Sequence, residues 1–145
     1  MVKLRIRRAH AKAMMPVYAH PGDAGMDLFS VENKILKPGE RAIVNTGLHV
    51  EVPEGFELQL RPRSGLAIKK GITLVNTPGT VDSGYRGEIG LIMINHSKED
   101  FEIKEGDRIA QAVLTRFESA ELEEASELSD SSRGTGGYGS TGVSG

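Results

Sequence analysis

Short apolar segments recur throughout residues 1–117, and sequences typical of tight turns separate them. Proline and glycine punctuate the intervals, as in Lys37-Pro38-Gly39-Glu40 and Pro53-Glu54-Gly55. The segments expected to form strands are residues 2–8, 35–36, 42–44, 48–52, 56–60, 72–75, 89–94, 101–103 and 109–117. Strands at this density predict an all-β fold, a sandwich or a jelly-roll-like barrel.

The composition fits one globular domain and limits its chemistry. A chain of 145 residues with 38% hydrophobic and 26% charged residues can bury a substantial core. The sequence contains no cysteine, which excludes a disulfide framework and a thiolate zinc site. A net charge of −2 argues against a general nucleic-acid binder, and no apolar run reaches membrane-spanning length. We therefore expect a cytoplasmic protein with no nucleic-acid or membrane partner.

One short helix is expected at residues 64–71, with Ser64 as its N-cap, two lysines in its last turn and Gly71 after its end. A helix N-terminus offers free N–H groups and partial positive charge to an anion. Because Arg61 and Arg63 lie immediately before it, the segment is a candidate phosphate site. The alternative is an ordinary capped surface helix with solvated arginines.

Residues 76–88 form an unusual connection between two expected strands, so a hairpin is predicted there. Three glycines and a proline give this segment a backbone that can approach a ligand closely. Asp82, Asn76 and Tyr85 add a carboxylate, an amide and an aromatic ring, which together can bind a base, a sugar and a water. The alternative is a long β-loop in which the Asp and Asn only form side-chain turns.

The chain changes character after residue 117. Residues 118–132 are rich in acidic and small side chains, which predicts a solvated linker or a short exposed helix without a catalytic role. The glycine-rich segment 133–145 is either a disordered end or a flexible arm that becomes ordered over a ligand. Arg133 and the hydroxyls that follow it favour a phosphate ligand.

Two further polar residues stand in apolar surroundings. Asp27 looks buried in Ala-Gly-Met-Asp-Leu, and Gln111 interrupts an otherwise apolar strand. A polar side chain in such a place needs a partner within the fold or in a ligand. Together with the hairpin and the two phosphate-type segments, they suggest a nucleoside polyphosphate site.

Five segments resemble the five ordered motifs of the trimeric dUTP pyrophosphatases. They are Ala-Gly-Met-Asp-Leu at 24–28, Arg-Pro-Arg-Ser-Gly-Leu-Ala at 61–67, the hairpin at 76–88, Glu-Gly-Asp-Arg-Ile-Ala-Gln at 105–111 and the arm at 133–142. The resemblance implies a jelly-roll-like barrel over residues 1–117 and a homotrimer with shared active sites. It implies that residues 118–132 link this barrel to an arm, 133–145, which closes a neighbouring site. The implied reaction converts dUTP to dUMP and pyrophosphate, limiting uracil in DNA and supplying dUMP for thymidylate synthesis.

The resemblance also implies roles for the hairpin residues. Asp82 is expected to be the general base that activates the attacking water. Tyr85 is expected to lie under the deoxyribose and to leave no room for a 2′-hydroxyl. Asn76 and the backbone around Thr80, Val81 and Gly90 are expected to bind the uracil edge, and Gly79 is a further substrate-binding position.

The same resemblance assigns the phosphates, the metal and the arm. The residues expected to bind phosphate are Arg63, Ser64, Gly65, Gln111 and, for the γ-phosphate, Arg133. Mg²⁺ is expected to be chelated mainly by the triphosphate, with Asp27 reaching it through water. Tyr138 is expected to stack on uracil where the family usually has phenylalanine, and Gly84 replaces a frequent acidic residue.

Two alternatives remain for a chain of this type. A dCTP deaminase shares the fold and much of the phosphate chemistry but needs an acid–base group at C4 of cytosine. A non-catalytic nucleotide sensor would retain the scaffold without turnover. The hairpin pattern argues against the first alternative, and Asp82 with the complete arm argues against the second.

Overall fold

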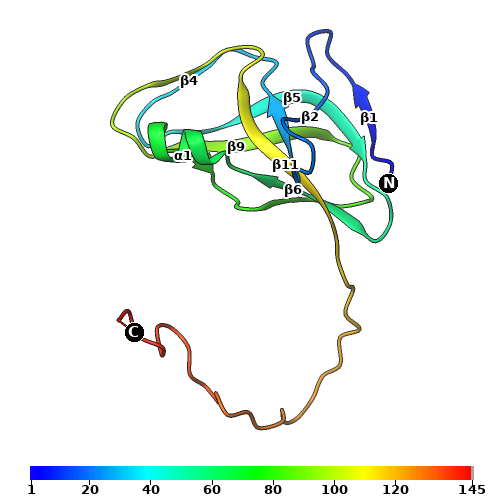
Figure 1. Cartoon of the computed structure of the whole chain (residues 1–145), viewed down its shortest axis with the longest axis vertical. Coiled ribbons are helices and arrows are strands. Elements are labelled where there is room, and N and C mark those ends of the chain that lie inside the picture. Colours follow the sequence, from blue (N-terminus) through cyan, green and yellow to red (C-terminus); the bar gives the residue numbers. More distant parts are fainter. Residues whose placement is uncertain (145) are drawn as a thin grey trace.

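Strands dominate the computed structural model of the protein, which describes residues 1–144. Its elements are β1 (Arg5–Arg8), β2 (Val17–Tyr18), β3 (Gly25–Phe29), β4 (Lys34–Leu36), β5 (Arg41–Glu51), β6 (Phe56–Arg61), α1 (Ser64–Lys70), β7 (Ile72–Leu74), β8 (Gly79–Val81), β9 (Glu88–Asn95), β10 (Phe101–Ile103) and β11 (Arg108–Arg116). Figure 1 shows them in one β-rich body from which the last part of the chain extends. Among residues 1–144, no helix is long and apolar enough to cross a membrane.

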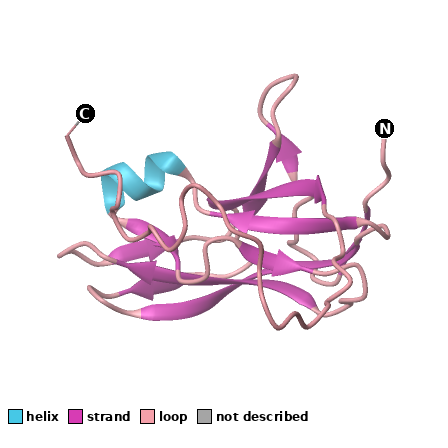
Figure 2. Ribbon diagram, turned by 90° about the horizontal axis from the view of Figure 1, so that it is seen from below, coloured by secondary structure: helices cyan, strands magenta, loops and turns pink. Residues whose placement is uncertain are grey.

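The strands form two larger antiparallel sheets and one small pair. One sheet has the order β1-β5-β9-β7, the other has the order β2-β3-β11-β6-β8, and β10 pairs with β4. Figure 2 shows the strands in layers, with α1 at one end. Along β9 the residues alternate between partly exposed and buried, as expected for a strand with one face on the core. The predicted all-β fold with one short helix is therefore confirmed within the described residues.

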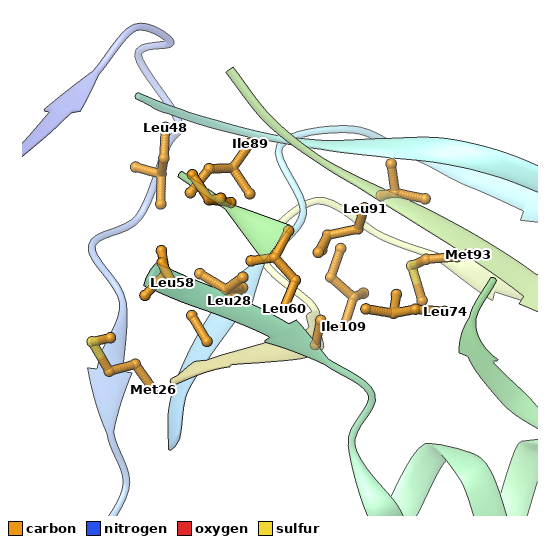
Figure 3. Packing of buried hydrophobic residues seen from close by; sticks show 14 of the residues in the cluster. Met26, Leu28, Leu48, Leu58, Leu60, Leu74, Ile89, Leu91, Met93 and Ile109 are labelled. Atoms are coloured by element: carbon orange, nitrogen blue, oxygen red, sulfur yellow. The ribbon is translucent and has the colours of Figure 1, made fainter. Parts of the chain in front are cut away.

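Aliphatic side chains from both sheets meet in the core (Figure 3). Leu28 and Ile109 come from one sheet and Leu91 and Met93 from the other, and each is at most 2% exposed. Burial of this kind is the main favourable term in folding. The core thereby fixes the sheets from which the polar residues of the loops project.

The structure joins residues 42–44 and 48–52, expected as two strands, into the single strand β5. The pairing of β5 with β9 shifts between Asn45 and His49, which marks a bulge. Gly47 lies in this bulge with φ of +67°, a left-handed conformation that side chains rarely adopt. The polar sequence Asn-Thr-Gly therefore bends a continuous strand instead of ending it.

Carboxylates and a hydroxyl satisfy the polar groups at the bulge. The N–H of Asn45 donates to Glu32 Oε1 at 3.1 Å, and the N–H of Gly47 donates to Glu88 Oε1 at 2.8 Å. Thr46 Oγ1, which is buried, donates to the carbonyl of Ile89 at 2.7 Å. Burial raises the pKa of Glu32, but the bond from Asn45 and the nearby Lys34 ammonium outweigh it and leave that pKa below its usual 4.5.

The N-cap of α1 lies one residue earlier than the sequence predicted. Arg63, with φ of −95° and ψ of 131°, is the N-cap, and no side chain caps the helix. The prediction of Ser64 as N-cap is wrong because the Arg63 carbonyl already accepts the first helical bond, from Ala67 N at 3.0 Å. The predicted stop is confirmed, since Gly71 is left-handed with φ of +64° and its N–H bonds back to the helix.

The hairpin at residues 76–88 joins the two sheets. Strands β7 and β9 pair as expected, with Leu74 opposite Met93. Within the connection, β8 pairs with β6 of the other sheet, with Thr80 opposite Gln59. Strand β8 differs from the prediction of a plain connection, because Gly-Thr-Val contains no apolar run long enough to indicate a strand.

The chain from residue 117 to residue 144 contains neither helix nor strand. The short helix considered for residues 118–132 is absent, and Leu122 is 91% exposed. Successive tight turns follow, with Gly136 N bonded to Arg133 O and Ser140 N to Gly137 O. The last residue of the predicted arm, at position 145, lies outside the described residues.

Side chains packed close to Gly47 at the β5 bulge should make substitution of this glycine destabilising. A Cβ there would lie 2.8 Å from the Cβ of His10 and 2.9 Å from that of Ala13, whereas Gly55, with φ of +77°, has nothing within 4 Å. Gly47→Ala should therefore lower the free energy of unfolding by about 1–3 kcal/mol more than Gly55→Ala. Urea unfolding at one protein concentration measures the difference, and equal losses would contradict the importance of this contact.

Candidate active site

A pocket of about 170 Å³ lies beneath the hairpin between β7 and β9. We refer to it as the hairpin pocket. Its lining residues are Leu60, Asn76, Gly79, Thr80, Val81, Asp82, Tyr85, Glu88, Ile89 and Gly90. The structure thus brings together all seven residues that the sequence assigned to base, sugar and water.

Strand β8 places the polar residues of the hairpin pocket. Val81 is 5% exposed and opposes Leu58 in the core, so it anchors the strand end. The next residue, Asp82, is exposed, as the alternation of side chains along a strand requires. The carbonyl of Asp82 accepts a hydrogen bond from Tyr85 N at 3.1 Å, which closes the turn that follows. The carboxylate is thereby presented at the pocket edge by a fixed backbone.

Tyr85 forms one wall of the pocket and is held by the chain around it. Its side chain is 46% exposed, and its hydroxyl donates to the carbonyl of Glu88 at 3.0 Å. Glu88 is a pocket residue that sequence reasoning did not assign. Its position as a carboxylate at the start of an apolar strand was the available signal, because such a group must find a donor.

A second group of charged residues surrounds Asp27. Its Oδ1 lies 3.2 Å from Arg63 Nε and its Oδ2 lies 3.2 Å from Arg108 Nε. The Asp27 side chain is 15% exposed, and Arg63 also donates to the Arg108 carbonyl at 3.1 Å. One carboxylate between two guanidinium groups leaves a net positive charge, which suits an oxyanion ligand.

The two arginines line a pocket of about 580 Å³, which we call the arginine pocket. Its lining residues are Met14, Phe29, Arg63, Leu66, Phe101, Glu102, Gly106, Asp107, Arg108 and Ile109. Ser64 and Gly65 adjoin Arg63 at the exposed start of α1. Sequence reasoning did not assign Arg108, although it lies in a segment that carried the family resemblance.

Gln111 finds a partner within the fold. Its Nε2 donates to the carbonyl of Pro62 at 2.9 Å, directly before Arg63 in the chain. A Cβ on Gly25 would overlap with Gln111 Oε1, so the glycine leaves the space that this amide occupies. Gln111 lines a further pocket of about 430 Å³ that includes Arg61.

Residues 1–144 contain no cluster of three or more His, Cys, Asp or Glu side chains that could hold a metal ion. Asp27 is the carboxylate among the residues predicted to approach a metal ion, and each of its oxygens forms an ion pair with a guanidinium group. Such an oxygen can still accept from a metal-bound water, and Mg²⁺ usually keeps several waters. The donor set therefore fits a contact through water, with other ligands supplied by phosphate.

Arg133 and Tyr138 do not join either pocket within one chain. Arg133 Nε donates to the nearby carbonyl of Gly136 at 2.7 Å, and Tyr138 is fully exposed. Figure 1 shows the segment that carries them running away from the β-rich body. The arm residues are thus separate from the other candidate residues.

Comparison with known proteins decides the family. Residues 11–142 match the family described as dUTPase. The chain belongs to the dUTPase family. Deoxyuridine 5′-triphosphate nucleotidohydrolase of Nautilia profundicola is 55% identical over 141 residues, covering 97% of this chain and 99% of the relative. The relative of that name from Clostridium tetani is 53% identical over 139 residues, covering 96% of each chain. The predicted resemblance is confirmed.

Solved structures of dUTPases share the fold. Staphylococcus bacteriophage 80alpha dUTPase, solved with dUPNHPP, has a TM-score of 0.91 and 32% identity and covers 99% of this chain and 100% of its own. A mutant dUTPase from phage phi11 of S. aureus, which coordinates a structural Mg(II) ion, has a TM-score of 0.81 and 29% identity, covering 88% and 99%. The jelly-roll-like dUTPase fold expected for the chain is confirmed.

The shared carboxylate of Asp27 should stabilise the fold more than an exposed pair does. Asp27→Asn removes the negative charge between two guanidinium groups and turns one acceptor oxygen into a donor that faces an arginine, so we expect a loss of about 1–3 kcal/mol in the free energy of unfolding. The control is Glu51→Gln, which breaks a pair with Arg5 whose side chains are 77% and 45% exposed. We expect the control to lose less than about 1 kcal/mol in urea unfolding. A larger loss in the control would contradict this account.

Proposed function

We propose that this protein hydrolyses dUTP to dUMP and pyrophosphate. The observation that carries the proposal is the hairpin pocket, where Asp82, Asn76 and Tyr85 line one cavity in a member of the dUTPase family. The chemistry is attack of a water oxygen on the α-phosphorus. A bond forms between that oxygen and phosphorus, and the bond from phosphorus to the α,β-bridging oxygen breaks, releasing pyrophosphate.

Asp82 acts as the general base in this proposal. Its exposed carboxylate can accept hydrogen bonds from both the attacking water and the sugar 3′-hydroxyl, and it takes the proton that the water loses. Two simultaneous bonds fix the direction of attack. Positioning of the water contributes more to the rate than the basicity of a carboxylate does.

The remainder of the hairpin pocket selects the nucleoside. Tyr85 provides a flat wall against the deoxyribose, and a 2′-hydroxyl on a ribose would clash with this wall. The uracil edge faces Asn76 and the backbone of β8 and Gly90. Backbone N–H and C=O groups can bond to this edge as they bond to a neighbouring strand in a sheet. Close backbone at this edge leaves no room for the methyl group of thymine.

The arginine pocket supplies phosphate-binding groups. Arg63 and Arg108 share a single carboxylate and so retain positive charge for a triphosphate. Ser64 and Gly65 add a hydroxyl and a backbone N–H near the bridging oxygen, where charge develops as pyrophosphate leaves. Gln111 is fixed against Pro62 and has a second amide hydrogen for a phosphate oxygen.

Asp27 contacts the metal site through water. Its two oxygens form ion pairs with Arg63 and Arg108, which orients the carboxylate and leaves lone pairs for a metal-bound water. Mg²⁺, when bound to the triphosphate, neutralises part of the charge on its oxygens. Asp27 would orient the hydrated ion through its bound water, and the scheme requires no direct metal ligand among residues 1–144.

The active site is shared between chains of a homotrimer. In support, the hairpin pocket and the arginine pocket of one chain have no lining residue in common. A substrate that uses both kinds of pocket can therefore take the nucleoside site from one chain and the phosphate site from another. We divide the chain into a barrel at 1–117, an acidic linker at 118–132 and an arm at 133–145. A linker of this length spans on the order of 20 Å, which suits an arm that crosses to a neighbour. Arg133 then pairs with the γ-phosphate and Tyr138 stacks on uracil.

The product dUMP is the expected precursor of thymidylate, and removal of dUTP limits the incorporation of uracil into DNA. We place this activity in the cytoplasm.

The alternative of a dCTP deaminase predicts ammonia from dCTP and no pyrophosphate from dUTP. A release assay on dUTP, UTP, dTTP and dCTP, with and without Mg²⁺, distinguishes the two activities. Only dUTP should give rapid pyrophosphate release, and Mg²⁺ should accelerate it.

Replacing the proposed base separates turnover from binding. Asp82→Asn keeps the shape of the side chain but removes the proton acceptor, so kcat should fall by at least about 100-fold. The affinity for a non-hydrolysable dUTP analogue should change by only a few-fold. Asp23→Asn is the control, because Asp23 caps an exposed turn at His20 N. Unchanged turnover in Asp82→Asn would exclude Asp82 as the base.

Deleting residues 133–145 tests the arm. The truncated protein should keep its fold and its trimer, because this segment adds neither helix nor strand through residue 144. Its kcat/KM for dUTP should fall by at least about 100-fold, since an open site misplaces the reacting groups. Light scattering and circular dichroism monitor assembly and fold. Loss of the fold would instead make the tail structural.

A further inference from the structure

Tyr85 lies over the position that a side chain at Gly87 would occupy. A Cβ on Gly87 would lie 2.8 Å from Cε2 of the tyrosine ring and closer still to Cζ and the hydroxyl oxygen. No real Cβ can be that close to another heavy atom. The ring can occupy its place only because residue 87 is glycine.

The tyrosine hydroxyl is fixed at the same time. It donates to the carbonyl of Glu88 at 3.0 Å, so the ring is held by packing on one side and by a hydrogen bond at its tip. A ring with both restraints cannot rotate without losing the bond. This matters because the side chain is 46% exposed, so packing alone does not enclose it.

The peptide groups that hold Tyr85 are themselves anchored to the β5 bulge. The side chain of Glu88 accepts from Gly47 N at 2.8 Å, and the next carbonyl, that of Ile89, accepts from Thr46 Oγ1 at 2.7 Å. On the other side of Gly87, the carbonyl of Arg86 lies 2.8 Å from His49 Nδ1. Gly87 is thus bracketed by segments bonded to one strand.

We propose that Gly87 and Glu88 are positioning residues that set the discrimination between deoxyribose and ribose by fixing the ring of Tyr85. The inference rests on the proposed function, in which Tyr85 meets the sugar. Steric exclusion of a hydroxyl works only if the excluding group resists displacement. A half-exposed tyrosine would otherwise turn aside at little cost, and UTP would enter. The bonds from Glu88 and the contact at Gly87 supply that resistance before the nucleotide binds.

Gly87→Ala is the direct test. The added methyl group meets the far end of a movable side chain, so the ring shifts while the barrel remains folded. The ratio of kcat/KM for dUTP to that for UTP should fall by about tenfold. Gly84→Ala is the matched control in the same hairpin, because a Cβ there has nothing within 4 Å. Its ratio should stay within about twofold of the unaltered protein.

Variants of Glu88 test the anchor separately. Glu88→Gln retains an oxygen that can accept from Gly47 N, so the dUTP:UTP ratio should be kept. Glu88→Ala removes the acceptor, and the ratio should fall as it does in Gly87→Ala. Tyr85→Phe removes the hydroxyl bond without altering Glu88 and should also lower the ratio. Thermal unfolding checks that each variant is folded. If Glu88→Ala does not fold, Gly87→Ala and Tyr85→Phe decide whether the ring position sets the dUTP:UTP ratio.

The outcomes separate this inference from the proposed function. A general structural defect lowers activity on dUTP and UTP alike and leaves the ratio unchanged. An unchanged ratio in Gly87→Ala and Tyr85→Phe, in a protein that does discriminate, overturns the positioning role alone. Absence of dUTP hydrolysis or of discrimination in the unaltered protein overturns the proposed function and the inference with it.

Discussion

The hydrogen bond from the Gly47 N–H to the carboxylate of Glu88 connects the bend in the longest strand to the loop that carries the candidate chemistry. A bulge exposes backbone groups that lose their ladder partners, and buried N–H groups without partners cost stability. Here the side chain of Glu88, the first residue of β9, accepts from that donor. The end of the hairpin is therefore tied to β5, although the two are distant in sequence.

The two candidate pockets are built differently. Backbone bonds and buried aliphatic residues such as Val81 define the hairpin pocket, which suits recognition of a flat base and a sugar. A partly buried and an exposed arginine, both paired with Asp27, line the arginine pocket, which suits a flexible, highly charged chain of phosphates. The rigid walls of the hairpin pocket suit selection of a ligand by shape, and the positive charge of the arginine pocket suits tight binding of an anion.

Sequence patterns predicted the fold well and the site in part. Alternating apolar residues identified β6, β9 and β11, and the motif containing Asp82 identified the hairpin residues that line one pocket. The patterns failed where tertiary contacts decide. Gly-Thr-Val forms β8 only because β6 offers a free edge, and Arg63 replaces Ser64 as N-cap because its carbonyl is already in the helix. Glu88 escaped notice because its donor lies across the sheet at Gly47.

Charge balance around Asp27 gives a physical reason for keeping a carboxylate where a triphosphate is expected. Without it, Arg63 and Arg108 would repel each other and turn toward solvent, which would cost positioning. With it, one negative charge orients two positive ones and still leaves an attractive site. The short side chain thus holds the two arginines at the edge of the arginine pocket.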